Sequence, residues 1–373
     1  MSESGKEKTA WRYRLDRRIR SALMFIVSRI VPRNAPQPAD LLSEKIEKII
    51  LVRAIFRLGD AILATPAILL FRQNFPAAQI DFVGASAAKP LFINLPINRF
   101  YGVYHNYLKA SCSYLVLLRE IRAQKYDLAV DVSGSSSAMG AFLVGFSGAR
   151  LRAGLNGKWD RWFNLRYSRS RDQNKYQSMT HLIGALGLAT GICYPQVMLS
   201  PDDLAAGRQR VAAILGESVG QVVGIFVGGR KARGKRWAKE RFLKLAVSLH
   251  AGGARVIVFI GPDERALAAY FQGELGRRAA VVFEPDLRRF ASLIASCHLF
   301  VACDSGPVHL ACALRVRTVV IFLHNNSDRW GPPADLARIV CQDGGVSVDT
   351  VFDACCQELF RLAPIELGAS RAS

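Results

Sequence analysis

Residues 304–333 include, in order, DSGPVHLACAL (304–314), TVVIF (318–322) and HNNSDRWGPP (324–333). An apolar run, Leu299–Ala302, comes just before them, so the order is strand, glycine turn, helix and second buried strand. Such a turn directs free backbone N–H groups and a helix N-terminus at one point, which suits an anion. Asp304 can accept from a hydroxyl, while Ser305 and Gly306 can donate to phosphate. The stretch predicts a ligand site; a capped helix between two core strands is the alternative.

The rest of the chain alternates short apolar runs with amphipathic segments from Lys48 onward. The other expected strands are Ile49–Ile55, Gln79–Val83, Leu128–Val132, Val222–Val227, Arg255–Ile260 and Thr318–Phe322. The other expected helices are Ala61–Asn74, Tyr114–Gln124, Lys239–His250 and Asp263–Leu275. Strand–helix alternation predicts parallel sheets with right-handed crossovers. Because the pattern runs twice, we expect an α/β protein with two Rossmann-like domains and a cleft between the carboxyl ends of their strands.

With 373 residues the chain is long enough for two domains with full cores. We expect a basic N-terminal segment and linker at 1–38, an acceptor-side domain at 39–198 and a nucleotide-sugar-binding domain at 199–373. The weaker region near Pro195–Pro201 would connect the two domains.

Two further stretches carry chemistry, RAIFRLGDAILATPA at 53–67 and GGRKARGKRW at 228–237. In the first, Asp60 follows a strand and a glycine, where a carboxylate can take a proton from a hydroxyl or cap the next helix. In the second, three glycines and five cations precede a helix, which suits phosphate, with an exposed basic loop as the alternative. The first turn has no GxGxxG and the second stretch no GxxxxGK[ST], which disfavours a Rossmann dehydrogenase and a P-loop protein.

Taken together and in this order, the three stretches resemble the signature of the heptosyltransferases, the bacterial glycosyltransferases of family 9. The resemblance spans roughly residues 46–340 and implies the GT-B architecture, in which two Rossmann-like parallel-sheet domains face each other across a cleft. It implies that Asp60 is the catalytic base. It also implies that Lys235, Ser305 and Gly306 hold the diphosphate of the donor.

Other residues are expected to contact the donor. Asp304 and Glu264 are expected to bind the ribose or the sugar, since Glu264 follows a strand where Rossmann-like domains often carry an acidic ribose ligand. Asp263 is expected to cap the next helix. Second-tier candidates are Gly59, Arg57, His309 and Arg233.

The chain departs from the family pattern in one region. There, His324-Asn325-Asn326 replaces a usual Gly-x-Thr, and Arg315 and Arg317 replace a usual Gly and Pro. These changes bear on the choice of donor.

The function implied by the resemblance is inverting glycosyl transfer, with ADP-heptose or another nucleoside-diphosphate sugar as donor and a lipopolysaccharide-core or related envelope glycan as acceptor. We expect neither a metal nor a cofactor, because no Asp-x-Asp lies at a strand end and no Cys/His pair has ligand spacing. A sugar-nucleotide epimerase on a similar scaffold is one alternative, and a charge-driven nucleic-acid-binding protein is another.

The formal charge of +20 calls for an acidic partner or surface. The basic residues are dispersed and form no nucleic-acid-binding motif, so we expect no nucleic acid. Residues 11–33 contain seven arginines and one aspartate, with apolar residues at helical spacing, which is typical of a helix lying on anionic lipid. We therefore expect a cytoplasmic protein, peripheral on the inner membrane. The eight cysteines lack CxxC spacing and indicate buried thiols in a reducing compartment.

Overall fold

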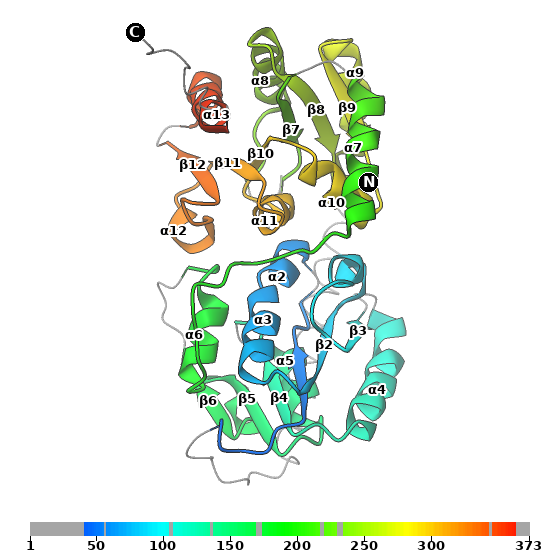
Figure 1. The fold of residues 1–373 in the computed structure, drawn as a ribbon, viewed down its shortest axis with the longest axis vertical. Helices are drawn as coiled ribbons and strands as arrows, with labels where there is room; N and C mark the ends of the chain where they lie inside the picture. Colours follow the sequence, from blue (N-terminus) through cyan, green and yellow to red (C-terminus); the bar gives the residue numbers. More distant parts are fainter. Residues whose placement is uncertain are drawn as a thin grey trace, which may run out of the picture. The chain divides into compact units, whose positions relative to one another are not determined.

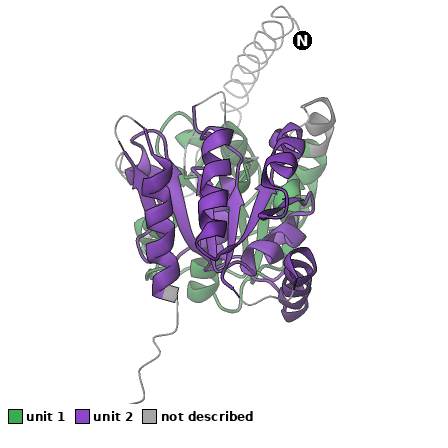
Figure 2. Ribbon diagram, turned by 90° about the horizontal axis from the view of Figure 1, so that it is seen from above, with its two compact units in different colours: residues 1–89, 95–173, 177–193 green, residues 90–94, 174–176, 194–373 purple. Residues whose placement is uncertain are grey.

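The computed structural model describes residues 41–55, 57–103, 107–134, 137–168, 174–216, 220–229, 234–342 and 345–362 (Figure 1). The predicted membrane segment 1–38 and the candidate Arg233 lie outside the described residues. The chain forms two compact units, shown in two colours in Figure 2. The first unit takes residues up to 89, 95–173 and 177–193, and the second takes 90–94, 174–176 and the chain from 194 onward.

The first unit is built on a parallel sheet. Its strands are β1 (Lys48–Val52), β2 (Gln79–Ala85), β3 (Arg99–Val103), β4 (Leu128–Asp131), β5 (Leu151–Leu155) and β6 (Leu165–Tyr167). Its helices and 3-10 turns are α2 (Leu58–Ile62), α3 (Thr65–Asn74), η1 (Ser86–Leu91), which runs into the second unit, α4 (Tyr107–Ala123), α5 (Ala138–Gly145), η2 (Asp160–Trp162) and α6 (Ser178–Ala185). The strand order is β3-β2-β1-β4-β5-β6. Strands β1 and β4 are buried on both faces, which is why they read as continuous apolar runs.

The second unit repeats this plan. Its strands are β7 (Val222–Phe226), β8 (Arg255–Ile260), β9 (Ala279–Phe283), β10 (Leu299–Cys303), β11 (Arg317–Phe322) and β12 (Ala337–Cys341). Its helices and 3-10 turns are α7 (Pro201–Leu215), α8 (Lys239–Ala251), η4 (Pro262–Leu267), α9 (Ala268–Leu275), α10 (Leu287–Ala295), α11 (Gly306–Ala313), α12 (Ser327–Trp330) and α13 (Val348–Leu362). The strand order is β12-β11-β10-β7-β8-β9, with every described pair parallel.

Helices cover both faces of the second sheet. One core cluster joins alternate strand residues such as Ile225 and Val258 to buried side chains of α8, α9 and α13. On the opposite face, Phe290 of α10 packs against Phe259 of β8, and α11 contacts β10 and β11. Figure 2 shows this sheet between its helix layers. The prediction of two Rossmann-like parallel-sheet domains is confirmed.

The buried strands at the centres of the two sheets were predicted well, whereas the four edge strands and β5 were missed. The prediction for β8 has the observed bounds, and the predictions for β1, β2, β4, β7, β10 and β11 differ at their ends. The missed strands are β3, β5, β6, β9 and β12. Four of these are short and carry exposed or half-buried residues, so none forms a continuous apolar run.

Two helices predicted as single elements are each divided. The segment 61–74 separates into α2 and α3 because Pro66, in the first turn of α3, has no N–H to continue the helix. The hydroxyl of Thr65 donates instead to the Ile62 carbonyl at 2.8 Å. The segment 263–275 separates into η4 and α9, and Gly261 rather than Asp263 holds the N-cap of η4. The prediction that Asp263 caps this helix is therefore wrong.

The described cysteines are free thiols, but they are not all buried. Cys297, Cys303, Cys312 and Cys355 are buried, and burial raises the pKa of Cys297 and of Cys303 to about 12, which makes them unreactive. Cys341 and Cys356 are exposed, so the prediction of burial is wrong for these two. None of the helices in the described ranges is both long enough and apolar enough to cross a membrane.

Candidate functional site

The carboxyl edge of the first sheet brings together residues from separate segments. The chain leaves β1 toward β2 on one side, while β4 lies on the other, so the order of the strands reverses between β1 and β4. In open α/β sheets such a switch point, at the carboxyl ends of the strands, is the usual ligand site. Arg53 directly follows β1, Asp60 lies in α2 and Asp131 ends β4. Val52 pairs in register with Asp131, which places these strand ends side by side.

Asp60 is held by a buried arginine. The Arg53 Nη2 donates to Asp60 Oδ1 at 3.1 Å, and Nη1 donates to the Val132 carbonyl at 2.7 Å. The Arg53 side chain is 4% exposed and that of Asp60 is 12% exposed. Arg57 occupies the N-cap position of α2, so the alternative in which Asp60 caps a helix is wrong. The Asp60 carboxylate therefore does not cap a helix, and it lies at the carboxyl edge of the sheet, where a ligand site is expected. Its role as a general base stays a prediction.

Asp131 was missed in the sequence, and it lies beside the same arginine. It is 3% exposed, and Oδ1 accepts from the Ser133 N–H at 2.9 Å. Burial raises the pKa of Asp131 to about 6, although Ser133 and the Arg53 charge both act to lower it. Burial likewise lowers the pKa of Arg53, against the opposing charges of Asp60 and Asp131. The signal that could have identified Asp131 is the same pattern seen at Asp60, a buried strand with an acid at its end and a glycine nearby.

The second sheet has its switch point between β7 and β10, and two predicted donor residues meet there. Lys235, after β7, donates from Nζ to the Asp304 carboxylate, which directly follows β10. The side chains are 21% and 10% exposed. Asn326, with its amide oxygen turned toward Lys235, accepts from Nζ at 3.3 Å and donates to the His324 carbonyl at 3.0 Å. The loop that departs from the family pattern therefore contacts the predicted phosphate-binding lysine.

Ser305 and Gly306 lie at the start of α11, as predicted. Ser305 is the N-cap residue, in extended conformation, and Pro307 occupies the first turn. Among the described residues the Ser305 hydroxyl makes no capping hydrogen bond, and its buried Oγ has no partner. Buried hydroxyls normally have a hydrogen-bond partner, so the unsatisfied Ser305 hydroxyl is suited to donate a hydrogen bond to a ligand. Binding of diphosphate here stays a prediction.

Glu264 is buried and contacts two described residues of the basic stretch 228–237. Its Oε1 lies 3.4 Å from the Gly229 N–H and 3.5 Å from Arg236 Nη1. A Cβ added at Gly228 or at Gly261 would lie 2.7 Å or 2.6 Å from Glu264 Oε2, so only glycine fits against this carboxylate. These contacts hold Gly229 and Arg236, which lie on either side of residues 230–233. The predicted contact of Glu264 with ribose is not tested by them.

The second-tier candidates lie in different environments. His309 is 4% exposed in α11, and its Nδ1 is 2.7 Å from the Tyr176 hydroxyl, so its side chain is packed within the second unit. Gly59 is buried in α2, and Arg57 is exposed at its start.

The two arginines that depart from the family pattern have structural partners. Arg317 donates from Nε to the buried Glu358 carboxylate of α13, which also pairs with Arg361 at 3.1 Å. Arg315 has a φ of 61°, the left-handed region that favours glycine, and its guanidinium lies over the Tyr194 ring. These contacts explain the positions of both side chains without any contact to the nucleotide-sugar donor.

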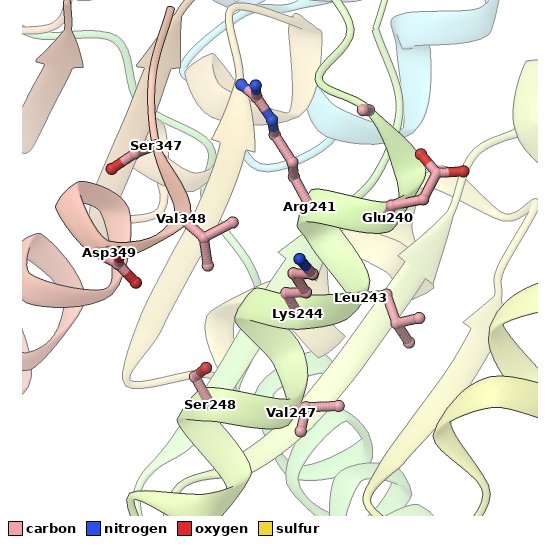
Figure 3. Close-up of a pocket in the computed structure, with 10 residues that line it drawn as sticks. Glu240, Arg241, Leu243, Lys244, Val247, Ser248, Ser347, Val348 and Asp349 are labelled. Carbon is pink, nitrogen blue, oxygen red and sulfur yellow. The ribbon is translucent and has the colours of Figure 1, made fainter.

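A separate pocket on the second unit contains none of the predicted site residues. It lies between α8 and the start of α13, and Figure 3 shows Lys244 and Val348 among its lining side chains. Arg241 beside it donates to the Val346 carbonyl at 2.8 Å, and Trp237 donates to the same carbonyl at 3.1 Å. This hollow is a feature of helix packing away from the switch point.

Comparison with known proteins gives consistent similarities. The sequence model of "Glycosyltransferase family 9 (heptosyltransferase)" matches residues 114–352, more than half of the chain. A lipopolysaccharide heptosyltransferase 3 from Escherichia coli is 26% identical over 295 residues, covering 74% of this chain and 83% of that protein. The crystal structure of a family 9 glycosyl transferase from Veillonella parvula superposes with a TM-score of 0.76 at 20% identity, over 86% of this chain and 99% of that one. The E. coli ADP-heptose lps heptosyltransferase II gives a TM-score of 0.71 at 20% identity, over 84% and 99%. At these identities the structures support the fold.

Proposed function

The chain belongs to glycosyltransferase family 9, the heptosyltransferase family, and on that premise we propose that it transfers a heptose from ADP-heptose to a lipopolysaccharide-core or related envelope glycan. The resemblance based on its three motifs is confirmed, and so is its class as a glycosyltransferase. The sugar and the acceptor come from relatives named as lipopolysaccharide and lipooligosaccharide heptosyltransferases. The comparisons favour neither an epimerase nor a nucleic-acid-binding protein.

The observation that carries the proposal is the contact between Lys235 and Asp304 at the switch point of the second sheet. Rossmann-like sheets bind nucleotides at this edge. In the proposed complex, Lys235 and the N–H groups at Ser305 and Gly306 bind the diphosphate, and Asp304 accepts from a hydroxyl of the ribose or the sugar. Glu264 would supply a second such acceptor.

We propose an inverting displacement with Asp60 as general base. The acceptor O–H proton passes to the Asp60 carboxylate as the acceptor oxygen forms a bond to the anomeric carbon of the heptose. The bond from that carbon to the phosphate oxygen breaks, and its electron pair leaves with ADP. Negative charge grows on the diphosphate during this step, so donors already fixed at Lys235 and Ser305 lower the barrier.

The proposed reaction uses neither a metal nor a cofactor, because Lys235 supplies the positive charge at the leaving diphosphate. Transfer measured in excess EDTA tests this point. Turnover should be retained, whereas a complete loss that magnesium or manganese restores would assign the neutralisation of the leaving group to a metal.

We also propose that residues 1–38 hold the enzyme on the cytoplasmic face of the inner membrane, near a lipid-anchored acceptor. Deletion of these residues should abolish sedimentation with vesicles containing anionic lipid and leave transfer to a delipidated acceptor intact. Unchanged vesicle binding would instead assign the membrane contact to the folded units.

The decisive experiment for the proposed function combines donor binding with product analysis. A thermal-shift panel of ADP-, UDP- and GDP-sugars should show stabilisation by the ADP-sugar, since a ligand that binds the folded state raises its melting temperature. Incubation with ADP-heptose and a truncated core glycan should then give a product heavier by one heptose. Stabilisation only by UDP- or GDP-sugars would overturn the donor assignment.

A further inference from the structure

We propose that Asn326 is a positioning residue for the donor, whose side-chain oxygen holds the Lys235 ammonium in place while the donor diphosphate binds it. This inference rests on the proposed function, in which Lys235 binds that diphosphate. It gives a role to the loop 324–326, where the chain departs from the family pattern. Neither the family motifs nor the comparisons assign one to this loop.

The side chain of Asn326 lies between a hydrogen-bond donor and an acceptor. Its amide nitrogen donates to the His324 carbonyl at 3.0 Å, and its amide oxygen accepts from Lys235 Nζ at 3.3 Å. The reverse orientation would set the amide NH₂ group against the ammonium and the amide oxygen against the carbonyl. The hydrogen-bond network therefore assigns the amide with its oxygen directed at the lysine.

Backbone hydrogen bonds hold Asn326 in this position. Its N–H donates to the His324 carbonyl at 2.8 Å. Its own carbonyl accepts from the N–H groups of Arg329 and Trp330 in α12, each at 3.2 Å. Because the main chain and the amide nitrogen are both bonded, the amide oxygen is presented to Lys235 from a fixed place.

Two glycines allow the Lys235 backbone to pack beside this loop. Gly234 has a φ of 65°, which favours glycine, and a Cβ there would lie 2.9 Å from His324 Nε2. A Cβ at Gly229 would lie 2.5 Å from the Lys235 carbonyl oxygen, so a larger residue would push the two segments apart. Both partners of the contact between Asn326 and Lys235 are thus held by their own segments.

The two partners of the ammonium differ in charge, and this difference gives Asn326 its role. Lys235 has three N–H donors, and Asp304 and Asn326 take two of them among the described residues, which leaves the third for a phosphate oxygen. An incoming diphosphate repels the Asp304 carboxylate but not the neutral amide. Asn326 therefore holds the lysine whether Asp304 stays or is displaced. A lysine that is already held loses less side-chain freedom when it binds the donor.

The test is a double-mutant cycle on ADP binding, measured by calorimetric titration of the full chain. Asn326→Ala should raise the dissociation constant for ADP by about 3- to 10-fold, as expected when one hydrogen bond that holds a binding group is lost. In the Lys235→Ala background the same substitution should change the constant by less than about twofold, because the lysine through which Asn326 acts is gone.

Asn325→Ala is the matched control. It makes the same change at the neighbouring exposed position, and the described residues include no contact between Asn325 and Lys235. ADP affinity should stay unchanged in this variant. Weakening equal to that of Asn326→Ala would overturn the inference, since it would assign the effect to the loop as a whole.

Asn326→Asp covers the case in which Asn326→Ala fails to fold, because Asp has nearly the same size as Asn. Its carboxylate adds a negative charge beside the ammonium, so ADP should bind about 10-fold more weakly than to the unmodified chain at low salt. The difference should shrink as the salt concentration rises. Equal affinity for the two chains at every salt concentration would overturn the inference.

The outcomes separate this inference from the proposed function. Weaker ADP binding in Lys235→Ala, combined with an Asn326→Ala effect that is absent or equally large in both backgrounds, would overturn the inference and leave Lys235 as the diphosphate ligand. Unchanged ADP binding in Lys235→Ala would overturn both. An Asn326→Ala effect that requires Lys235 supports the inference, since a merely structural role in placing α12 would weaken binding equally in both backgrounds.

Discussion

Lys235 and Asp304, 69 residues apart in the sequence, form an ion pair at the carboxyl edge of the second sheet. Each follows a central strand, and those strands are hydrogen-bonded neighbours although two other strands separate them in the chain. The pair neutralises the lysine that is proposed to meet the donor diphosphate. The donor diphosphate must therefore bind Lys235 beside Asp304 or displace the Asp304 carboxylate. Substituting each of the two side chains separately can distinguish their contributions to donor binding.

Lys235→Ala should weaken ADP binding. A charge-assisted hydrogen bond to a diphosphate contributes about 1.5–3 kcal/mol, which corresponds to a dissociation constant raised by about 10- to 200-fold. Calorimetric titration with ADP measures it. Asp304→Asn is the informative companion, since weaker binding fits contact with a hydroxyl of the donor, and tighter binding means that Asp304 only restrains Lys235. Unchanged ADP affinity in Lys235→Ala would move the phosphate site elsewhere.

Asp60→Asn should abolish transfer and leave ADP binding nearly intact. Loss of a general base removes about 10²–10⁴-fold in rate, and Asn keeps the size of the side chain. Single-turnover measurement of heptose transfer gives the rate, and thermal unfolding shows whether the variant is folded. Normal turnover in a folded variant would eliminate Asp60 as the base.

The sequence predicted those features that are encoded locally. Asp60, Lys235 and Asp304 each follow a buried strand, and a glycine lies close to each, so their positions at strand ends could be predicted from short stretches. The Arg53–Asp60 pair and the Asn326–Lys235 contact depend on which strands are neighbours, and that order is not visible in a single segment. Edge strands such as β6 were missed because exposed residues interrupt their apolar pattern.

The backbone conformation of Arg315, one of the residues that differ from the family pattern, leads to a prediction about stability. Because its φ is 61°, Arg315→Gly should be more stable than Arg315→Ala by about 1 kcal/mol, the reverse of the usual order. Both variants lose the contact with the Tyr194 ring, so the comparison isolates the backbone. Urea unfolding measures the difference. The control is Arg208, exposed within α7, where Gly should be less stable than Ala by about 1 kcal/mol. The same order at both positions would contradict the argument.

Asp131 should impose a pH dependence on stability that Asp131→Asn lacks. Burial raises its pKa from 3.8 to about 6, so between these values the folded state binds more protons than the unfolded state. Stability from this group is therefore greatest below about pH 4 and falls as the pH rises to 6, by an amount on the order of 3 kcal/mol. The Asn variant cannot lose a proton, and all other groups are common to both chains. Its unfolding free energy, measured in urea at pH 4, 5, 6 and 7, should thus improve relative to the unmodified chain as the pH rises. A difference that stays constant across this range would mean that Asp131 ionises equally in the folded and unfolded states, and that Arg53 compensates its burial completely.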